Sequence, residues 1–176
     1  GTVIATLEAG AVSYLYYAFR LIHLPIGLIG VALATAILPA LSAQAATRPV
    51  EELKETLAFA LQLAFFVAFP AMIGLLVFRV PIVHLLFERG QFTRHETLAT
   101  AEVLLFYALG ICFYVLNRVI VPVYYALQDT RTPVLIGIAS VLVNVALSLL
   151  LMPFLKVSGL AFATALSSSV NFSLLF

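Results

Sequence analysis

Arg20 is the residue of this chain whose position most suggests a binding function. It stands about nine residues into an apolar run that begins near Ala11, roughly 13 Å along a helix. Placing a guanidinium that deep in a membrane costs at least about 2.5–3.5 kcal/mol. The same helical face, within about 60°, carries Ser13, Tyr16, His23 and Gly27. An arginine that snorkels to the headgroups accounts for the charge, whereas a cavity-facing cation for an anionic substrate accounts for the whole polar face.

A second polar face follows in segment 97–127. On a straight helix one narrow face would carry Tyr107, Tyr114, Arg118 and Tyr125. The alternative is an interfacial belt of aromatic residues, but a belt lies at one depth, and positions 107 and 125 are about 27 Å apart along a helix. The pattern therefore favours a polar groove, with Pro122 placed to bend the helix near Tyr125.

Two stripes of small polar residues follow. One contains Gly137, Ser140, Asn144 and Ser148, and the next contains Thr164, Ser168 and Asn171. Residues of this kind usually allow close packing and hydrogen bonds between membrane helices, so we expect Asn144 and Thr164 to face one another. The alternative is a site for a hard cation such as sodium, built from amide and hydroxyl oxygens. The lack of an acidic residue on either stripe weighs against the ion.

The composition indicates which elements must carry these faces. Of 176 residues, 64% are apolar and 10% are charged, against about 45–50% and 25% in a soluble domain. Such a chain is a polytopic membrane protein, not a soluble enzyme. The net charge of +1 gives no indication of nucleic-acid binding, and the single cysteine, Cys112, excludes an internal disulfide. No pattern typical of a catalytic centre is present, so we do not expect an enzyme.

Apolar runs define the expected fold. Four uncharged stretches can each cross a bilayer core, and a fifth segment, 97–127, carries only two charges. We predict an all-α fold, a polytopic transmembrane helix bundle with five full spans plus an N-terminal stub at residues 1–8. Over residues 1–176 the predicted single lobe has spans at about 11–42, 54–78, 94–127, 133–152 and 158–176.

Charged segments connect the predicted spans. Residues 48–55 predict a surface turn with Pro49 at a helix start, and 79–96 predict a short apolar helix, a turn at Gly90 and a capping box of Thr93 with Glu96. Tight turns are expected at 128–133 and 153–159. Lysines and arginines divide almost evenly between the two sides, so charge does not set the orientation. With no initial Met and an apolar end, we expect a piece of a longer protein.

Three strings carry a family resemblance. They are SYLYYAFRLIHLPIGLIGVALATAILPALS at 13–42, LFERGQFT at 86–93 and YYALQDTRTPV at 124–134. In this order and spacing they resemble the MurJ (MviN) lipid II flippases, of the multidrug/oligosaccharidyl-lipid/polysaccharide exporter superfamily. The resemblance implies the end of helix seven through helix twelve of a fourteen-helix exporter, which is its second lobe, and a first lobe as partner. It also places loops 48–55 and 128–133 in the cytoplasm.

The same resemblance implies a function. These flippases move lipid II, a polyprenyl-pyrophosphate-linked precursor of the peptidoglycan cell wall, across the bacterial inner membrane by alternating access. A cationic cavity would bind the headgroup through Arg20, Tyr16, His23, Tyr107, Tyr114 and Arg118. Arg20 matches the family's cavity arginine, whereas Phe19 stands where the family usually has an aspartate. The expected partners are lipid II or a related polyprenyl-pyrophosphate lipid and membrane lipids, without nucleic acid.

The resemblance also bears on a metal. Some members are thought to bind sodium, and Asn144 and Thr164 match two of the ligand positions, with Ser148 where an acid can occur. No other cofactor is expected. Two alternatives to lipid II flipping stay open, namely export of another polyprenyl-linked oligosaccharide and a membrane scaffold that transports nothing.

Overall fold

Helices make up nearly all of the chain that the structure, a computed structural model, describes: residues 11–47, 50–90 and 92–176. In chain order they are α2 (Ala11–Pro25), the π-helix η1 (Ile26–Val31), α3 (Ala32–Thr47), α4 (Val50–Phe87), α5 (Arg94–Leu109), α6 (Ile111–Ala126) and α7 (Arg131–Leu175). Those residues contain no strand, which confirms the all-α prediction. The predicted stub at 1–8 and the helix start at Pro49 lie outside the described residues.

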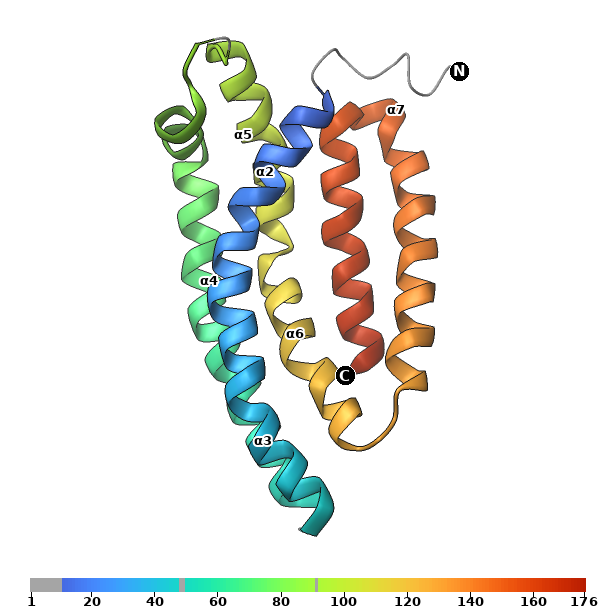
Figure 1. The fold of residues 1–176 in the computed structure, drawn as a ribbon. Helices are drawn as coiled ribbons and strands as arrows, with labels where there is room; N and C mark the ends of the chain where they lie inside the picture. Colours follow the sequence, from blue (N-terminus) through green and yellow to red (C-terminus); the bar gives the residue numbers. More distant parts are fainter. Residues whose placement is uncertain (1–10, 48–49, 91) are drawn as a thin grey trace.

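Five membrane crossings follow from these helices. The segments Ala11–Ala43 and Glu51–Phe87 are each long and apolar enough to span a bilayer, and α5 with α6 forms one span bent by 44°. Helix α7 contains a non-helical residue, Lys156, and Figure 1 shows its two halves running side by side in opposite directions. The prediction of five spans is therefore confirmed.

The sharp reversal inside α7 depends on unusual backbone geometry. Lys156 has φ 49° and ψ −127°, a region that glycine adopts far more easily than lysine. Three residues later, a Cβ on Gly159 would lie 2.9 Å from the carbonyl oxygen of Leu151. The absent side chain thus lets the two halves of α7 approach closely, and the turn falls inside the predicted range 153–159.

The α4–α5 region differs in part from the prediction. Helix α4 includes residues 51–55, which were predicted to belong to a surface turn. It also continues through Pro81 to Phe87, so the short helix predicted in 79–96 is the end of α4 and not a separate element. A proline bends a helix without ending it when the backbone hydrogen bonds resume in the turns that follow. Figure 1 shows the last turns of α4 turned sideways. The predicted turn at Gly90 (φ 59°) is confirmed. The predicted capping box is also present, with the Thr93 N–H donating to Glu96 Oε2 at 2.7 Å.

Small buried residues let the helices pack. Helix α4 runs along both α5 and α6, and α2 packs against α5. Alanines at every fourth position of α4, Ala60, Ala64 and Ala68, are fully buried, as is Ala18 of α2. Small residues allow the close approach on which helix association in a membrane depends. Large apolar side chains such as Phe66 point outward instead, as expected for a surface that meets lipid.

The connections alternate between the two ends of the bundle. Figure 1 shows the end of α3, the start of α4 and the α6–α7 turn at one end. The α4–α5 loop and the reversal in α7 lie at the other end. This arrangement matches the prediction that segments 48–55 and 128–133 share one side of the membrane.

Candidate functional site

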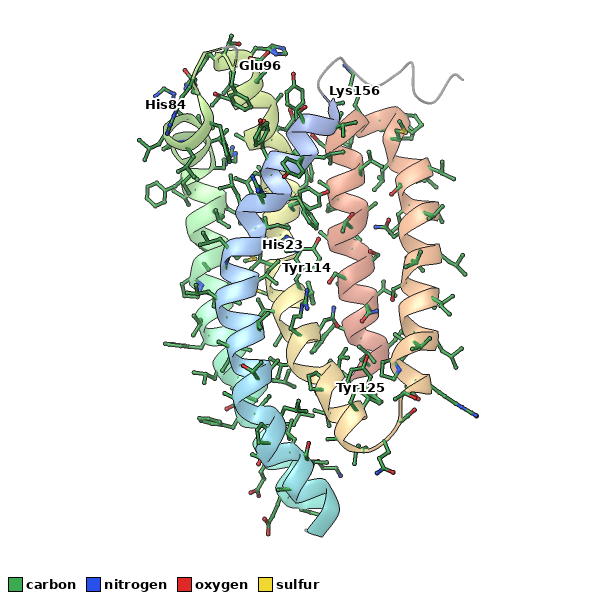
Figure 2. The ribbon with its side chains drawn as sticks, in the orientation of Figure 1. His23, His84, Glu96, Tyr114, Tyr125 and Lys156 are labelled. Carbon is green, nitrogen blue, oxygen red and sulfur yellow. The ribbon has the colours of Figure 1, made fainter. Side chains whose placement is uncertain are left out.

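A cavity of about 910 Å³ lies between the α2–η1–α3 rod, α6 and both halves of α7. Its polar lining includes His23, Tyr114, Asn117, Arg118, Asn144 and Asn171. Figure 2 shows His23, Tyr114 and Tyr125 at successive levels between the rod and α7. The cavity therefore follows the long axis of the lobe through segments that are otherwise apolar.

Arg118 gives this cavity its electrostatic character. Among the described residues of the lining it is the only one with a permanent charge, and none of them is acidic. Within the same described part of the chain, no salt bridge or hydrogen bond engages its guanidinium. An uncompensated cation among neutral polar groups favours an anion, and a guanidinium can hold phosphate or carboxylate through two parallel hydrogen bonds.

Five of the six predicted binding residues lie in two locations. His23, Tyr114 and Arg118 line the cavity. Tyr16 and Arg20 do not, and they form an exposed pair on α2, where the guanidinium carbon lies 5.2 Å from the centre of the Tyr16 ring. We call this pair the outer patch. On a helical wheel Arg20 is about 60° from His23, so the outer patch adjoins the cavity without being part of it.

Tyr107 lies in neither location. Its side chain is 7% exposed and packs edge-on against the ring of Phe19, with ring centres 6.0 Å apart. The prediction that Tyr107 shares one straight face with Tyr114 and Arg118 is wrong, because the helix breaks at Gly110 and bends by 44°. Only the part of that face beyond the bend, including Tyr125, reaches the cavity.

Hydrogen bonds join the two halves of α7 along one wall. Asn144 Nδ2 donates to Thr164 Oγ1 and to Ser167 Oγ, each at 3.2 Å. Asn171 Nδ2 donates to Ser140 Oγ at 2.9 Å. The prediction that Asn144 and Thr164 face one another is confirmed.

Asn117 is a wall residue that the sequence reasoning did not single out. Its Nδ2 donates to the carbonyl oxygen and the hydroxyl of Ser168, at 3.0 and 3.1 Å, which ties α6 to the second half of α7. An asparagine next to Arg118 in an apolar run is itself a signal, since buried amides in membranes need partners.

Comparison with known proteins decides the family. The family described as "Lipid II flippase MurJ" matches residues 1–176. The chain belongs to the MurJ lipid II flippase family. It is 38% identical over 174 residues to a probable lipid II flippase MurJ of Vibrio cholerae, and 41% identical over 175 residues to that of Rhizobium meliloti. Each alignment covers 99% of this chain, which spans 33% of the relative's length.

A solved structure supports the same assignment. The structure titled "Lipid II flippase MurJ, inward closed conformation" superposes with a TM-score of 0.88 at 31% identity, covering 98% of this chain and 36% of the other. The helical arrangement described above is therefore that of part of a MurJ protein.

Sodium, implied for some MurJ members, does not fit the donors on the α7 wall. The Asn144 amide presents its nitrogen to the two hydroxyls. Those hydroxyls themselves donate, from Thr164 to the Leu160 carbonyl and from Ser167 to the Thr164 carbonyl. Ser148 is not among the lining residues, and the described lining supplies no carboxylate. We therefore derive no step through a metal ion.

Asn144→Ala should destabilise the full-length protein equally in sodium and potassium chloride. Two interhelical hydrogen bonds at about 0.6 kcal/mol each give a loss of roughly 1 kcal/mol. Thermal midpoints in detergent, measured in each salt, test this, with Ser148→Ala as the control from the same helix. A loss seen in sodium alone would instead show that the α7 wall holds the ion.

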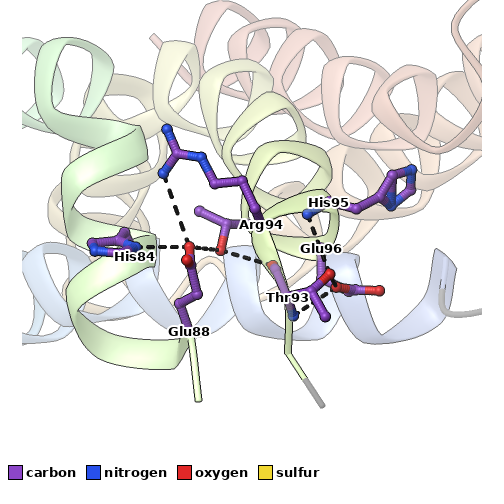
Figure 3. Close-up of polar contacts among 7 residues, drawn as sticks. His84, Glu88, Thr93, Arg94, His95 and Glu96 are labelled. Carbon is purple, nitrogen blue, oxygen red and sulfur yellow. Dashed lines mark hydrogen bonds and ion pairs between the residues drawn. The ribbon is translucent and has the colours of Figure 1, made fainter. Parts of the chain in front are cut away.

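A separate polar cluster ties α4 to α5 (Figure 3). The Glu88 carboxylate accepts hydrogen bonds from His84 Nδ1 at 2.7 Å and from Thr97 Oγ1 at 2.6 Å, and Arg94 Nη1 lies 3.9 Å away. Glu88 belongs to the LFERGQFT string that resembles the MurJ family. The hydrogen bonds from His84 and Thr97 hold the pKa of Glu88 below its ordinary value.

Glu88→Gln should reduce stability at neutral pH more than at acidic pH. Because the pKa of Glu88 is lower in the folded protein, its carboxylate stabilises the fold above the ordinary glutamate pKa of about 4.3. That contribution is lost as the pH falls through the lowered value. Thermal midpoints of the wild type and Glu88→Gln should therefore converge between pH 7 and pH 3. A constant difference, or the same behaviour in the exposed control Glu51→Gln, would contradict this role.

Proposed function

We propose that this chain is the cavity-bearing lobe of a transporter that flips lipid II across the bacterial inner membrane. The observation that carries the proposal is Arg118, a cation without an ionic partner among the described residues, in a cavity of a MurJ-family lobe whose described lining has polar groups but no acid. The likeness to a lipid II flippase structure supports it. Because the chain spans about a third of its relatives' length, the remaining lobe would be supplied by the rest of the transporter.

The chemistry of the cavity suits the headgroup of such a lipid. A pyrophosphate esterified at both ends carries two negative charges, and two oxygens of a phosphate group fit the fork of an arginine. The low dielectric of a membrane protein strengthens this attraction relative to water. Histidine, asparagine and hydroxyl groups on the same walls can bind sugar and peptide parts, while the polyprenyl tail stays in the bilayer. A headgroup on its way through would meet Arg20 of the outer patch as well as Arg118.

Complementation tests this function. The full-length transporter that carries this chain should restore growth to a bacterium depleted of its own lipid II flippase. Arg118→Ala should restore growth poorly and Arg118→Lys in part, because lysine keeps the charge without the fork. Arg131→Ala, at the exposed first residue of α7, serves as the matched control.

Two outcomes would overturn the proposal. A full-length protein that inserts normally but never restores growth would point to another polyprenyl-linked oligosaccharide, or to a scaffold that transports nothing. Full growth with Arg118→Ala at matched protein level would remove Arg118 from headgroup binding.

A further inference from the structure

Gly30 lies where the α2–η1–α3 rod crosses α6. A Cβ added to Gly30 would lie 3.2 Å from Cβ and 3.3 Å from Cγ of Arg118, and 3.7 Å from Cα of Val115. Gly30 is buried in this contact. Gly27, in the same π-helix, is exposed, and an added Cβ there would meet nothing within 4 Å. Two glycines three residues apart thus differ in whether they touch the cavity's cation.

Gly30 continues the buried stripe of the rod, four residues after Ile26 and eight after Ile22, and a π-helix spans this part of the stripe. Pro25 has no N–H to donate to the preceding turn, and the helix widens to a π-helix from Ile26 to Val31 directly after it. The α-helix resumes at Ala32, and in its first turn the Thr35 hydroxyl donates to the carbonyls of Val31 and Ala32 at 2.9 and 3.0 Å.

The contact involves the root of the Arg118 side chain, not its flexible end. Cβ is fixed by the backbone, and Cγ is set by the first side-chain torsion, which has few allowed values in a helix. A methyl group at position 30 would crowd these two atoms by a few tenths of an ångström, which a shift of α6, of the rod or of that torsion would relieve. Each of these changes alters where the guanidinium lies relative to the rod.

We propose that Gly30 is a positioning residue for Arg118, whose missing side chain keeps the guanidinium directed into the cavity. The inference rests on the proposed function in one respect, since it takes Arg118 to be the group that binds the anionic headgroup. Gly30 itself contacts no substrate; it acts through the arginine stem. The π-helix that follows Pro25 is the element that presents it.

A double-mutant comparison in the full-length transporter tests the proposal. Gly30→Ala should lower the flipping rate by about two- to tenfold, the range expected for an arginine forced off its preferred torsion. Gly27→Ala, the matched control with the same change of residue, should leave the rate unchanged. Adding Gly30→Ala to Arg118→Ala should cause no further loss, because residues that act through one another are not additive.

A thiol measurement tests the geometry without relying on transport. In Arg118→Cys, made with Cys112→Ala, the sulfur occupies the position of the arginine Cγ. Adding Gly30→Ala should change its rate of reaction with a charged methanethiosulfonate several-fold, while Gly27→Ala should not. The measurement uses membrane-inserted protein only. It therefore still shows whether Gly30 sets the position of the side chain at residue 118 if Gly30→Ala reduces expression.

The results separate failure of this inference from failure of the proposed function. If Arg118→Ala flips normally, the proposed role of Arg118 fails, whatever the thiol shows. If Arg118→Ala is impaired but Gly30→Ala matches Gly27→Ala in both rate and thiol reactivity, the positioning role is wrong. A Gly30→Ala loss that recurs undiminished in the Arg118→Ala background would show a general packing effect and also overturn it.

Discussion

Arg20→Ala in the full-length transporter is expected to abolish growth of a flippase-depleted bacterium, whereas Arg20→Lys should retain part of it. Arg20 is exposed on α2, beside the cavity that contains Arg118, and its guanidinium lies over the ring of Tyr16. A charge held within an apolar span is costly, and the neighbouring ring offsets only about 0.5–1 kcal/mol at an exposed site. The expected loss of growth follows from the proposed role of Arg20 in binding an anionic headgroup.

The comparison requires matched protein levels and a control arginine. Membrane insertion of Arg20→Ala should be near normal, because removing a charge from a span lowers the cost of insertion. Arg131→Ala removes a charge from the exposed start of α7 and should restore growth fully. Full growth with Arg20→Ala at equal abundance would show that this arginine only snorkels to the lipid headgroups.

Gly110→Leu is expected to prevent accumulation of folded protein, and Gly110→Ala to lower its stability by about 1–3 kcal/mol. A Cβ at this position would lie 2.9 Å from Cα and Cβ of Ala165 and 2.9 Å from Cε2 of Tyr114. The backbone of α7 occupies that space, so a side chain there must separate α7 from α6. The bend between α5 and α6 would open at the same point.

Gly137→Ala provides the opposing control. Position 137 lies within α7, and an added Cβ there would meet nothing within 4 Å. Replacing glycine by alanine in an open helical position removes backbone freedom from the unfolded chain and typically stabilises by about 0.5–1 kcal/mol. Thermal midpoints in detergent should therefore move in opposite directions for the two alanine variants. Equal shifts would mean that Gly110 provides helix flexibility and not space for Ala165.

Features that depend on neighbouring residues along the chain could be predicted from the sequence. The capping box of Thr93 and Glu96 formed as expected, because its bonds join residues three apart. The turn at Gly90 formed as well. The pairing of Asn144 with Thr164 was predictable for a related reason, since two adjacent antiparallel helices with polar stripes must satisfy those groups against each other.

Helical-wheel reasoning failed where a helix changed direction or pitch. It assumes a straight helix of constant period, but the bend at Gly110 turns Tyr107 into the core while Tyr114 and Arg118 reach the cavity. The π-helix after Pro25 also departs from the constant period that a helical wheel assumes. Near Pro81 the sequence reasoning predicted the end of a span, whereas α4 continues to Phe87.

By itself the sequence determined that this protein is a bundle of five membrane-spanning helices of the MurJ type and that two of its few charges, Arg20 and Arg118, lie within apolar spans. The length of an apolar run and the free-energy cost of placing a charge in it are properties of one segment in a membrane. Both can be judged without knowing which other segments pack against it. Only the tertiary structure decided that Arg118 lines the cavity, that Arg20 lies beside it, and that Gly30 contacts the stem of Arg118. The places of these three residues depend on helix bends and on contacts of a few ångströms where helices cross. Both arise from packing between segments that are distant in the chain.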